Sequence, residues 1–224
     1  MPGFLLKFVN RILSNMDRIS QTISLFDRHA QLYMDKYMDV SLYSESFDFF
    51  ASHLPGKTVL ELGCGPGNVT SYLLKKNRSL EILATDLAPA MLGLAKINNP
   101  QADFAIMDCR NILSVNKIFD GIMCAFCLPY LSKEEAMELI ADASKSLRSR
   151  GLLYISTMED DYSTSGINRS SSGEEILMFN HERDYLVCAF ADNNFEMVFE
   201  QRKKYSDPYG KPVTDLLLIG KLKP

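Results

Sequence analysis

The amino-acid sequence predicts an α/β fold in which a mostly parallel sheet is covered by helices on both faces. Apolar segments of strand length alternate with segments of helical periodicity between residues 58 and 157. The first strand and the first helix of this series are joined by a turn that contains three glycines. Two more apolar segments close the chain, separated by the turn-forming stretch SDPYGKP. The alternation predicts parallel strands, and the closing pair predicts an antiparallel hairpin at one edge of the sheet.

Composition favours one globular, cytoplasmic unit. The chain has 224 residues, of which 46% are hydrophobic and 23% charged, and its net charge of −4 argues against a surface that binds nucleic acid everywhere. The five cysteines are odd in number, which suggests reduced thiols and no disulfide framework. Cys124 and Cys127 form a C-x-x-C pair inside an apolar run; a structural zinc site usually needs a second pair, so we expect no metal.

Residues 1–53 are expected to form helices, because aromatic and aliphatic residues recur there at three- and four-residue spacing. The first apolar stretch, FLLKFVNRIL, is interrupted by polar residues and is too short to span a membrane. We expect a short amphipathic helix at this point, with a membrane-surface role as the alternative. Residues 54–224 then form one compact domain that begins after the Pro55-Gly56 break.

Within this domain, strands and helices follow in order. A helix is expected over 68–76 after the glycine turn, and another begins near Asp86, with Pro89 in its first turn, where a missing N–H costs little. Ser132 and Glu135 have the spacing of a capping box, which predicts a helix that ends near residue 148. The expected parallel strands are 58–62, 80–85, 102–107, 119–126 and 151–157.

The last part of the chain changes character. Residues 158–175 are polar and rich in serine and glycine, which indicates a flexible loop or flap. A helix over 180–193 is followed by two strands, 195–205 and 213–222. The total is seven strands, and the strongly apolar strand 119–126 suits a central position that is buried on both faces.

The strongest functional signal is the segment VLELGCGPGN, residues 59–68. Its glycines allow tight turns and a close approach to a ligand, and open α/β sheets bind ligands outside the carboxyl ends of their strands. The dinucleotide fingerprint G-x-G-x-x-G would require glycine where Asn68 stands, and no phosphate-binding P-loop pattern is present. An NAD-dependent oxidoreductase is therefore disfavoured.

This segment resembles the first motif of the class I S-adenosylmethionine (SAM)-dependent methyltransferase family, which has a Rossmann-like three-layer sandwich fold. The resemblance implies SAM as cofactor and S-adenosylhomocysteine as product, with residues 1–53 covering the active site of the domain 54–224. The motif usually begins with an acidic residue, here Glu61. Cofactor contacts from this segment are then expected at Glu61, Gly63, Cys64 and Gly65.

Acidic residues end the next two expected strands. A carboxylate at Asp86 can accept hydrogen bonds from both ribose hydroxyls of an adenosine, although a helix cap ahead of Pro89 is a compatible interpretation. The resemblance implies that Leu87 and Met91 lie against the adenine, with core packing as the alternative for both. It also implies adenine contacts from Asp108 and from the backbone of Cys109, with a solvated turn as the alternative for Asp108.

The methionine end of SAM is expected at the end of the fourth strand. The segment FDGIMCAFCLPYL resembles the family's fourth motif, which makes Ala125 and Phe126 the expected contacts, although core packing explains much of this segment equally well. Relatives often use an N-terminal tyrosine to cover SAM. Tyr37 is the first choice for that position and Tyr33 the second.

Methyl transfer from a sulfonium needs mainly positioning and exclusion of water, so no nucleophile is obligatory. Candidates for a general base are Tyr130, His29 and His181, each of which is more often structural than catalytic. The segment after the fourth strand lacks an Asn-Pro-Pro-Tyr pattern, which favours a small-molecule acceptor over nucleic acid. A non-catalytic SAM-binding protein and an RNA methyltransferase remain the alternatives.

Overall fold

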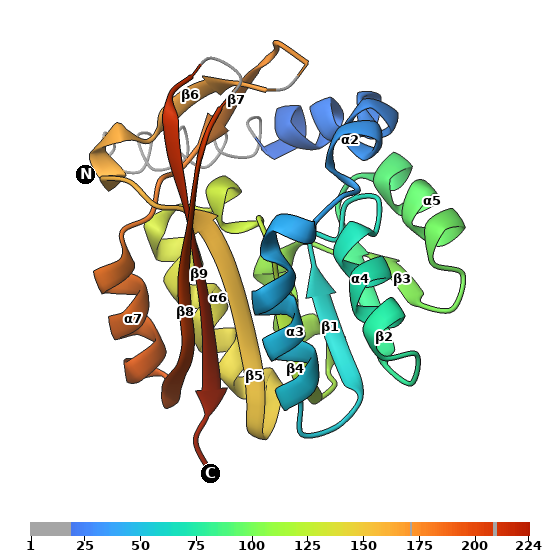
Figure 1. Cartoon of the computed structure of the whole chain (residues 1–224), viewed down its shortest axis with the longest axis vertical. Helices are drawn as coiled ribbons and strands as arrows, with labels where there is room; N and C mark the ends of the chain where they lie inside the picture. Colours follow the sequence, from blue (N-terminus) through green and yellow to red (C-terminus); the bar gives the residue numbers. More distant parts are fainter. Residues whose placement is uncertain (1–18, 171, 208–209) are drawn as a thin grey trace, which may run out of the picture.

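The computed structural model describes residues 19–170, 172–207 and 210–224, and the amphipathic helix expected at the N-terminus lies outside them. A seven-stranded sheet has helices on both faces (Figure 1). Its strand order is β3-β2-β1-β4-β5-β9-β8. The strands are β1 (Thr58–Leu62), β2 (Glu81–Asp86), β3 (Asp103–Ile106), β4 (Phe119–Cys124), β5 (Leu147–Met158), β8 (Phe195–Ser206) and β9 (Pro212–Leu222).

The sheet confirms the predicted topology. The first five strands pair in parallel, and β9 pairs antiparallel with both β5 and β8. The chain leaves β1 toward β2 and β3 and later returns to its other side with β4. The carboxyl ends of β1 and β4 therefore flank the point where the strand order reverses, which is where open α/β sheets bind ligands.

Two apolar layers hold the helices on the sheet. On one face, α3 (Ser44–His53), α4 (Asn68–Lys76) and α5 (Pro89–Asn98) bury residues against strand positions such as Val59. On the other face, α6 (Lys133–Ser146) and α7 (Arg183–Asp192) pack against the alternate positions, such as Leu60. Successive strand residues point to opposite faces, so β1 and β4 are buried on both sides and mostly apolar, with Glu61 and Asp120 as buried acidic exceptions.

A roof lies above the carboxyl ends of the strands (Figure 1). It consists of the helical segment 19–28, α2 (Ala30–Tyr37) and a two-stranded hairpin of β6 (Gly166–Arg169) and β7 (Glu175–Met178). Glu174 at the hairpin joins the two parts, because it contacts Nη2 of Arg28 and Nε2 of His29, each at 2.5 Å. The roof thus connects segments about 145 residues apart in the sequence.

Several boundaries differ from the sequence prediction. The strand expected from residue 151 begins at Leu147, directly after α6 ends at Ser146. The polar stretch 158–175 is partly ordered: β5 extends to Met158, and a short turn, η4 (Tyr162–Thr164), leads into β6. The strand expected to reach residue 126 ends at Cys124, because Phe126 has a φ of 58° and leaves the ladder. The helix expected from residue 180 begins at Arg183, since His181 forms a bridge with Glu159 instead.

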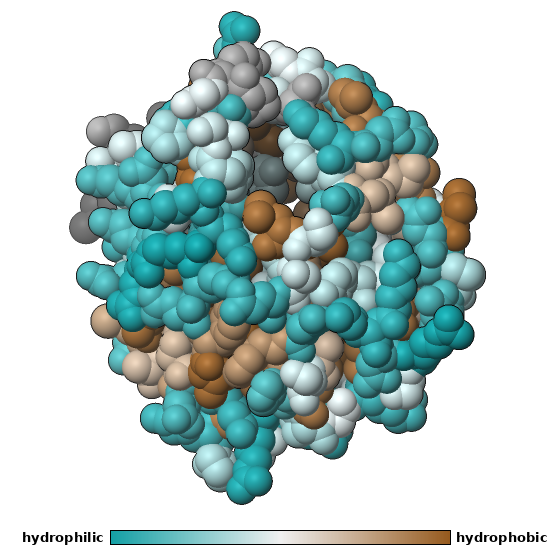
Figure 2. Space-filling model, in the orientation of Figure 1, coloured by the Kyte–Doolittle hydropathy of each residue, from teal (hydrophilic) through white to brown (hydrophobic). Residues whose placement is uncertain are grey.

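The described helices include none with the length and apolar character that crossing a membrane requires. Most of the face shown in Figure 2 is hydrophilic. A hollow opens in its upper part, at the level where the roof meets the sheet, and apolar side chains border it.

Candidate active site

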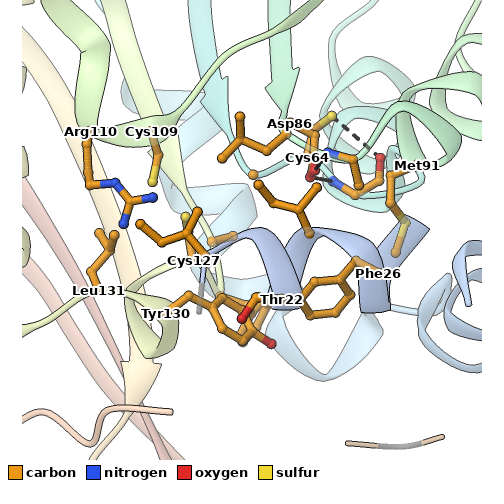
Figure 3. Close-up of a pocket in the computed structure, with 18 of the residues that line it drawn as sticks. Thr22, Phe26, Cys64, Asp86, Met91, Cys109, Arg110, Cys127, Tyr130 and Leu131 are labelled. Atoms are coloured by element: carbon orange, nitrogen blue, oxygen red, sulfur yellow. Dashed lines mark hydrogen bonds between the residues drawn. The ribbon is translucent and has the colours of Figure 1, made fainter. Parts of the chain in front are cut away.

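A cavity lies between the carboxyl ends of β1, β2 and β4 and the roof. Figure 3 shows Cys64, Asp86 and Met91 on one side of it, and Phe26, Thr22 and Tyr130 on the opposite side. The glycine turn, the ends of the central strands and the N-terminal helical segment therefore contribute to the same cavity.

The glycine turn has a backbone that other residues would strain. Gly63, Gly65 and Gly67 have φ values of +65°, +53° and +81°. A Cβ on Gly67 would lie 2.4 Å from Nδ2 of Asn99, so the α4 N-terminus needs glycine for space as well. A Cβ on Gly65 would instead have Tyr33 as its neighbour, at 3.7 Å across the cavity. The predicted cofactor loop thus presents its bare backbone to the cavity.

Asp86 anchors this turn and also faces the cavity. Its Oδ2 accepts a hydrogen bond from the Gly65 N–H, and its Oδ1 accepts one from the Ala88 N–H, both at 2.9 Å. The two sequence interpretations, ligand contact and local cap, are therefore compatible. An ionised carboxylate has about four acceptor positions. Two remain for hydroxyls of a ligand, which is what the ribose of an adenosine requires. Burial raises the pKa of Asp86, and the backbone donors oppose that shift.

Glu61 lies beneath the turn and is 2% exposed. Its Oε2 accepts a hydrogen bond of 2.6 Å from the Thr70 hydroxyl. Burial raises its pKa to about 8, so the carboxyl is largely protonated at neutral pH. Because Glu61 borders the cavity, a cationic ligand group beside it would favour the ionised form.

Of the four residues predicted to contact the adenine, three line the cavity and one does not. Leu87, Met91 and Cys109 line the cavity. The carboxylate of Asp108, in contrast, caps η2 (Cys109–Val115) through the Arg110 N–H and forms an ion pair with the Arg110 guanidinium at 2.9 Å. It is Arg110 that reaches the cavity wall, where Glu135 also contacts it at 3.2 Å. Sequence reasoning missed Arg110, because its partners are set by the packing of η2 against α6.

Phe126 is held in an unusual conformation at the end of β4. Its positive φ is rare for a bulky residue and costs roughly 1–3 kcal/mol, which surrounding contacts must offset. The Phe126 N–H donates to the buried Ser156 hydroxyl at 2.9 Å, and the Tyr43 ring packs on the Phe126 ring with centroids 4.6 Å apart. Ala125 and Phe126 both line the cavity.

Thiols in the cavity wall are not nucleophiles. A hydrogen bond with Cys127, together with burial, raises the pKa of the Cys109 thiol. Burial raises the pKa of the Cys64 thiol. These side chains therefore stay protonated and act as small apolar groups. Cys127 also limits the space beside the turn, since a Cβ on Gly63 would lie 3.1 Å from its Sγ.

The N-terminal aromatic residues take positions that only the fold reveals. Tyr33, the second choice for a residue over the cofactor, lies in the cavity wall. Tyr37, the first choice, is 38% exposed and packs behind Tyr33 with ring centroids 4.7 Å apart. Phe26 packs edge-to-face on both Tyr33 and Tyr130, at 5.8 and 5.3 Å. The three rings form a continuous aromatic wall.

Comparison with known proteins agrees with this geometry. Residues 59–151 match the model of a methyltransferase domain family. Residues 59–151 therefore form a methyltransferase domain, in agreement with the SAM-dependent family that the glycine turn resembles. The match runs from β1 to the first part of β5 and so includes β1, β2 and β4, whose carboxyl ends border the cavity.

Relatives of this methyltransferase domain include a protein named as a methyltransferase from Invertebrate iridescent virus 6, 30% identical over 127 residues, which are 52% of this chain and 47% of that protein. The malonyl-[acyl-carrier protein] O-methyltransferase of Haemophilus influenzae is 30% identical over 139 residues, covering 61% and 50%. The chain spans about half the length of these curated relatives.

Solved structures share the fold of the methyltransferase domain. The 1,6-didemethyltoxoflavin-N1-methyltransferase of Burkholderia thailandensis, with its acceptor and S-adenosylhomocysteine bound, superposes with a TM-score of 0.69 at 20% identity and covers 93% of this chain and 90% of its own. The magnesium protoporphyrin IX methyltransferase of Synechocystis, with SAM bound, has a TM-score of 0.65 at 17% identity, covering 93% and 96%.

Of the three candidate bases, only Tyr130 lies in the cavity wall of the domain. His29 faces Glu174 in the roof. His181 is buried, and its ring is in contact with the Tyr185 hydroxyl and, through Nε2, with the Leu128 carbonyl oxygen at 2.9 Å. Burial lowers the pKa of His181, so this ring is neutral. Because both ring nitrogens already have partners, His181 is not placed to act as a base.

Proposed function

We propose that this protein transfers a methyl group from SAM to a small-molecule acceptor. The observation that carries the proposal is Asp86 beside the glycine turn: a carboxylate in the cavity wall, fixed by two backbone donors, with acceptor positions left for two hydroxyls. The matched domain family supports the same cofactor.

The residues of the cavity fit SAM by their chemistry. Asp86 would accept from the ribose hydroxyls, and the bare backbone at Gly65 would allow close approach. Leu87 and Met91 offer an apolar surface to an adenine. Glu61 would face the cationic methionine end. When bound, SAM supplies a methyl group that is already activated on a sulfonium.

The protein then has to orient the acceptor and exclude water. The strained position of Phe126 fixes an aromatic face where the end of β4 meets the cavity. Burial raises the pKa of Tyr33 and of Tyr130, so both phenols stay protonated and can donate hydrogen bonds. Tyr130 would thus hold an acceptor oxygen or nitrogen in place more readily than it would remove a proton.

The roof supports a small acceptor. The helical segment 19–28 and the β6–β7 hairpin both contribute to the cavity wall, and Glu174 links them through Arg28 and His29. A further contact ties this segment to the SAM side, since Oδ1 of Asp27 accepts from the Ala90 N–H at 2.6 Å. A cavity enclosed in this way admits a compact molecule far more easily than a polymer.

The first test is calorimetric titration with SAM, S-adenosylhomocysteine and NAD. We expect binding of the two adenosyl ligands without NAD, followed by release of S-adenosylhomocysteine in a screen of small acceptors. A folded sample that binds neither adenosyl ligand would refute the cofactor assignment. Binding without turnover on any small molecule or RNA would instead support a non-catalytic SAM-binding protein.

A further inference from the structure

The part of the cavity beyond β4 has an apolar and aromatic wall. The helical segment 19–28 contributes one strip, in which Ile19, Thr22, Ile23 and Phe26 follow the i, i+3, i+4, i+7 spacing of a single helix face. Thr22 is the one polar member of this strip. The opposite strip comes from two places: the end of η3 (Leu128–Tyr130) with the next residue, and β7 with the residue that follows it. We call this region the outer chamber and define it by Ile23, Phe26, Tyr130, Leu131, Leu177 and Phe179.

Aromatic rings give the outer chamber a fixed shape. Phe26 meets Tyr130 edge-to-face, with ring planes at 83°. The Phe179 ring stacks on the Tyr162 ring, with ring planes at 11°. The Phe179 N–H donates a hydrogen bond to the Pro129 carbonyl oxygen at 2.8 Å. Edge-to-face and offset stacked contacts are the geometries that aromatic rings prefer, so a ligand ring can join this set without loss of packing.

The charges of the cavity wall are already paired or belong to the cofactor side. Among the described lining residues Arg110 is the single cation, and its guanidinium is shared between Asp108 and Glu135. The acidic groups Glu61 and Asp86 lie at the glycine turn. An anionic acceptor would therefore lose its hydration in the outer chamber without gaining an unpaired cation from the described wall, which is costly.

We infer that the acceptor of this methyltransferase is an uncharged aromatic molecule, held by the rings of the outer chamber and oriented by the hydroxyls of Thr22 and Tyr130. This inference rests on the proposed function and narrows its substrate class. Carboxylic acids are expected to be poor acceptors, because the described wall offers a carboxylate no unpaired cation.

Two probes that share a naphthalene ring and differ in charge test the inference. The protein is first saturated with S-adenosylhomocysteine, and 2-naphthol or 2-naphthoate is then titrated near pH 7, where the naphthol is neutral and the naphthoate anionic. We expect the naphthol to bind at least about tenfold more tightly, a difference of about 1.4 kcal/mol. Equal or tighter binding of the naphthoate, or binding of neither probe, would overturn the inference.

A cation added to the outer chamber should offset this preference. Leu177→Arg places a guanidinium in the wall on β7, and we expect it to raise naphthoate affinity at least about tenfold. Ile97→Arg is the matched control, because Ile97 is 77% exposed on α5 and outside the cavity wall. Failure of S-adenosylhomocysteine itself to bind the parent protein would refute the proposed function, whereas binding of that ligand with unchanged naphthoate affinity in Leu177→Arg would refute only the outer chamber as the acceptor site.

Discussion

Glu61 offers the sharpest test of the site, because its protonation couples the cofactor cavity to the stability of the fold. Its pKa is about 8 in the folded protein, against an ordinary value of 4.5. The folded protein therefore retains a proton that the unfolded chain releases above about pH 4.5. Stability should fall as the pH rises from about 4.5 to about 8, and this contribution should level off above that.

The size of the effect follows from the two pKa values. Each pH unit between them corresponds to about 1.4 kcal/mol, so the loss from Glu61 reaches about 3 kcal/mol at pH 7 and about 5 kcal/mol above pH 8. Glu61→Gln removes the ionisation and retains a carbonyl oxygen for the Thr70 hydroxyl. As the pH rises from 4.5 to 8.5, the free energy of unfolding of the variant should therefore increase by several kcal/mol relative to that of the parent protein.

Urea unfolding at a series of pH values measures this difference directly. The quantity of interest is the difference between the two proteins, because other titrating groups then cancel. Glu138→Gln, on the exposed face of α6, is the control and should follow the parent curve. Parallel curves for Glu61→Gln and the parent protein would show that Glu61 does not hold the proton, and the electrostatic description of the site would be wrong.

The same proton should report on SAM. We expect the cationic methionine end of SAM to favour ionised Glu61, so binding near pH 7 should release a proton. Calorimetry in buffers of different ionisation enthalpy detects this release. The parent protein should show it and Glu61→Gln should not; equal proton release in both would place the methionine end elsewhere.

Three further changes probe the rest of the cavity. Asp86→Asn replaces a carboxylate oxygen that accepts from a backbone N–H and that would face the ribose hydroxyls of SAM. SAM binding should therefore weaken by about 1–3 kcal/mol in calorimetry, and undiminished affinity in a folded variant would remove Asp86 from the site. Gly65→Ala strains a residue at φ +53° and extends into the cavity, so SAM affinity and the melting temperature should both fall, whereas Gly93→Ala, with open space around its Cβ within α5, should leave affinity unchanged. Ser156→Ala deprives the Phe126 N–H of its acceptor, and urea unfolding should show a loss of about 1–3 kcal/mol; a loss below about 0.5 kcal/mol would mean that the strained turn does not depend on this bond.

Much of the fold and the cofactor side of the cavity could be predicted from local sequence. The glycine turn needs positive φ at three alternate positions, and that requirement is visible in the residue types themselves. Asp86 follows its strand directly, so its position at the carboxyl end of β2 follows from the strand assignment. The capping box of Ser132 and Glu135 is present as the sequence indicated, since both partners lie within one helical turn.

Other features of the site depend on contacts between segments that are distant in the sequence. Tyr33 and Tyr37 are both N-terminal tyrosines, and only the approach of α2 to the glycine turn distinguishes the one in the cavity wall. The aliphatic strip of the segment 19–28 has a readable helical period, but the sequence does not say which surface that face covers. The order within 158–175 arises because Ile176 is buried and Glu174 finds partners in the roof, not from strong local propensity.

The sequence by itself determined the order of strands and helices, the parallel sheet with its antiparallel edge, and the glycine turn with Asp86, because each is encoded by residues within a few positions of one another. Tertiary structure alone decided which groups share the cavity with them. Arg110 forms an ion pair with Glu135 on another helix, and Glu174 connects the roof to Arg28, which lies 146 residues away in the sequence. Such pairs form only when distant segments pack against each other. That packing depends on the whole core, so it cannot be read from the spacing of residues within one segment.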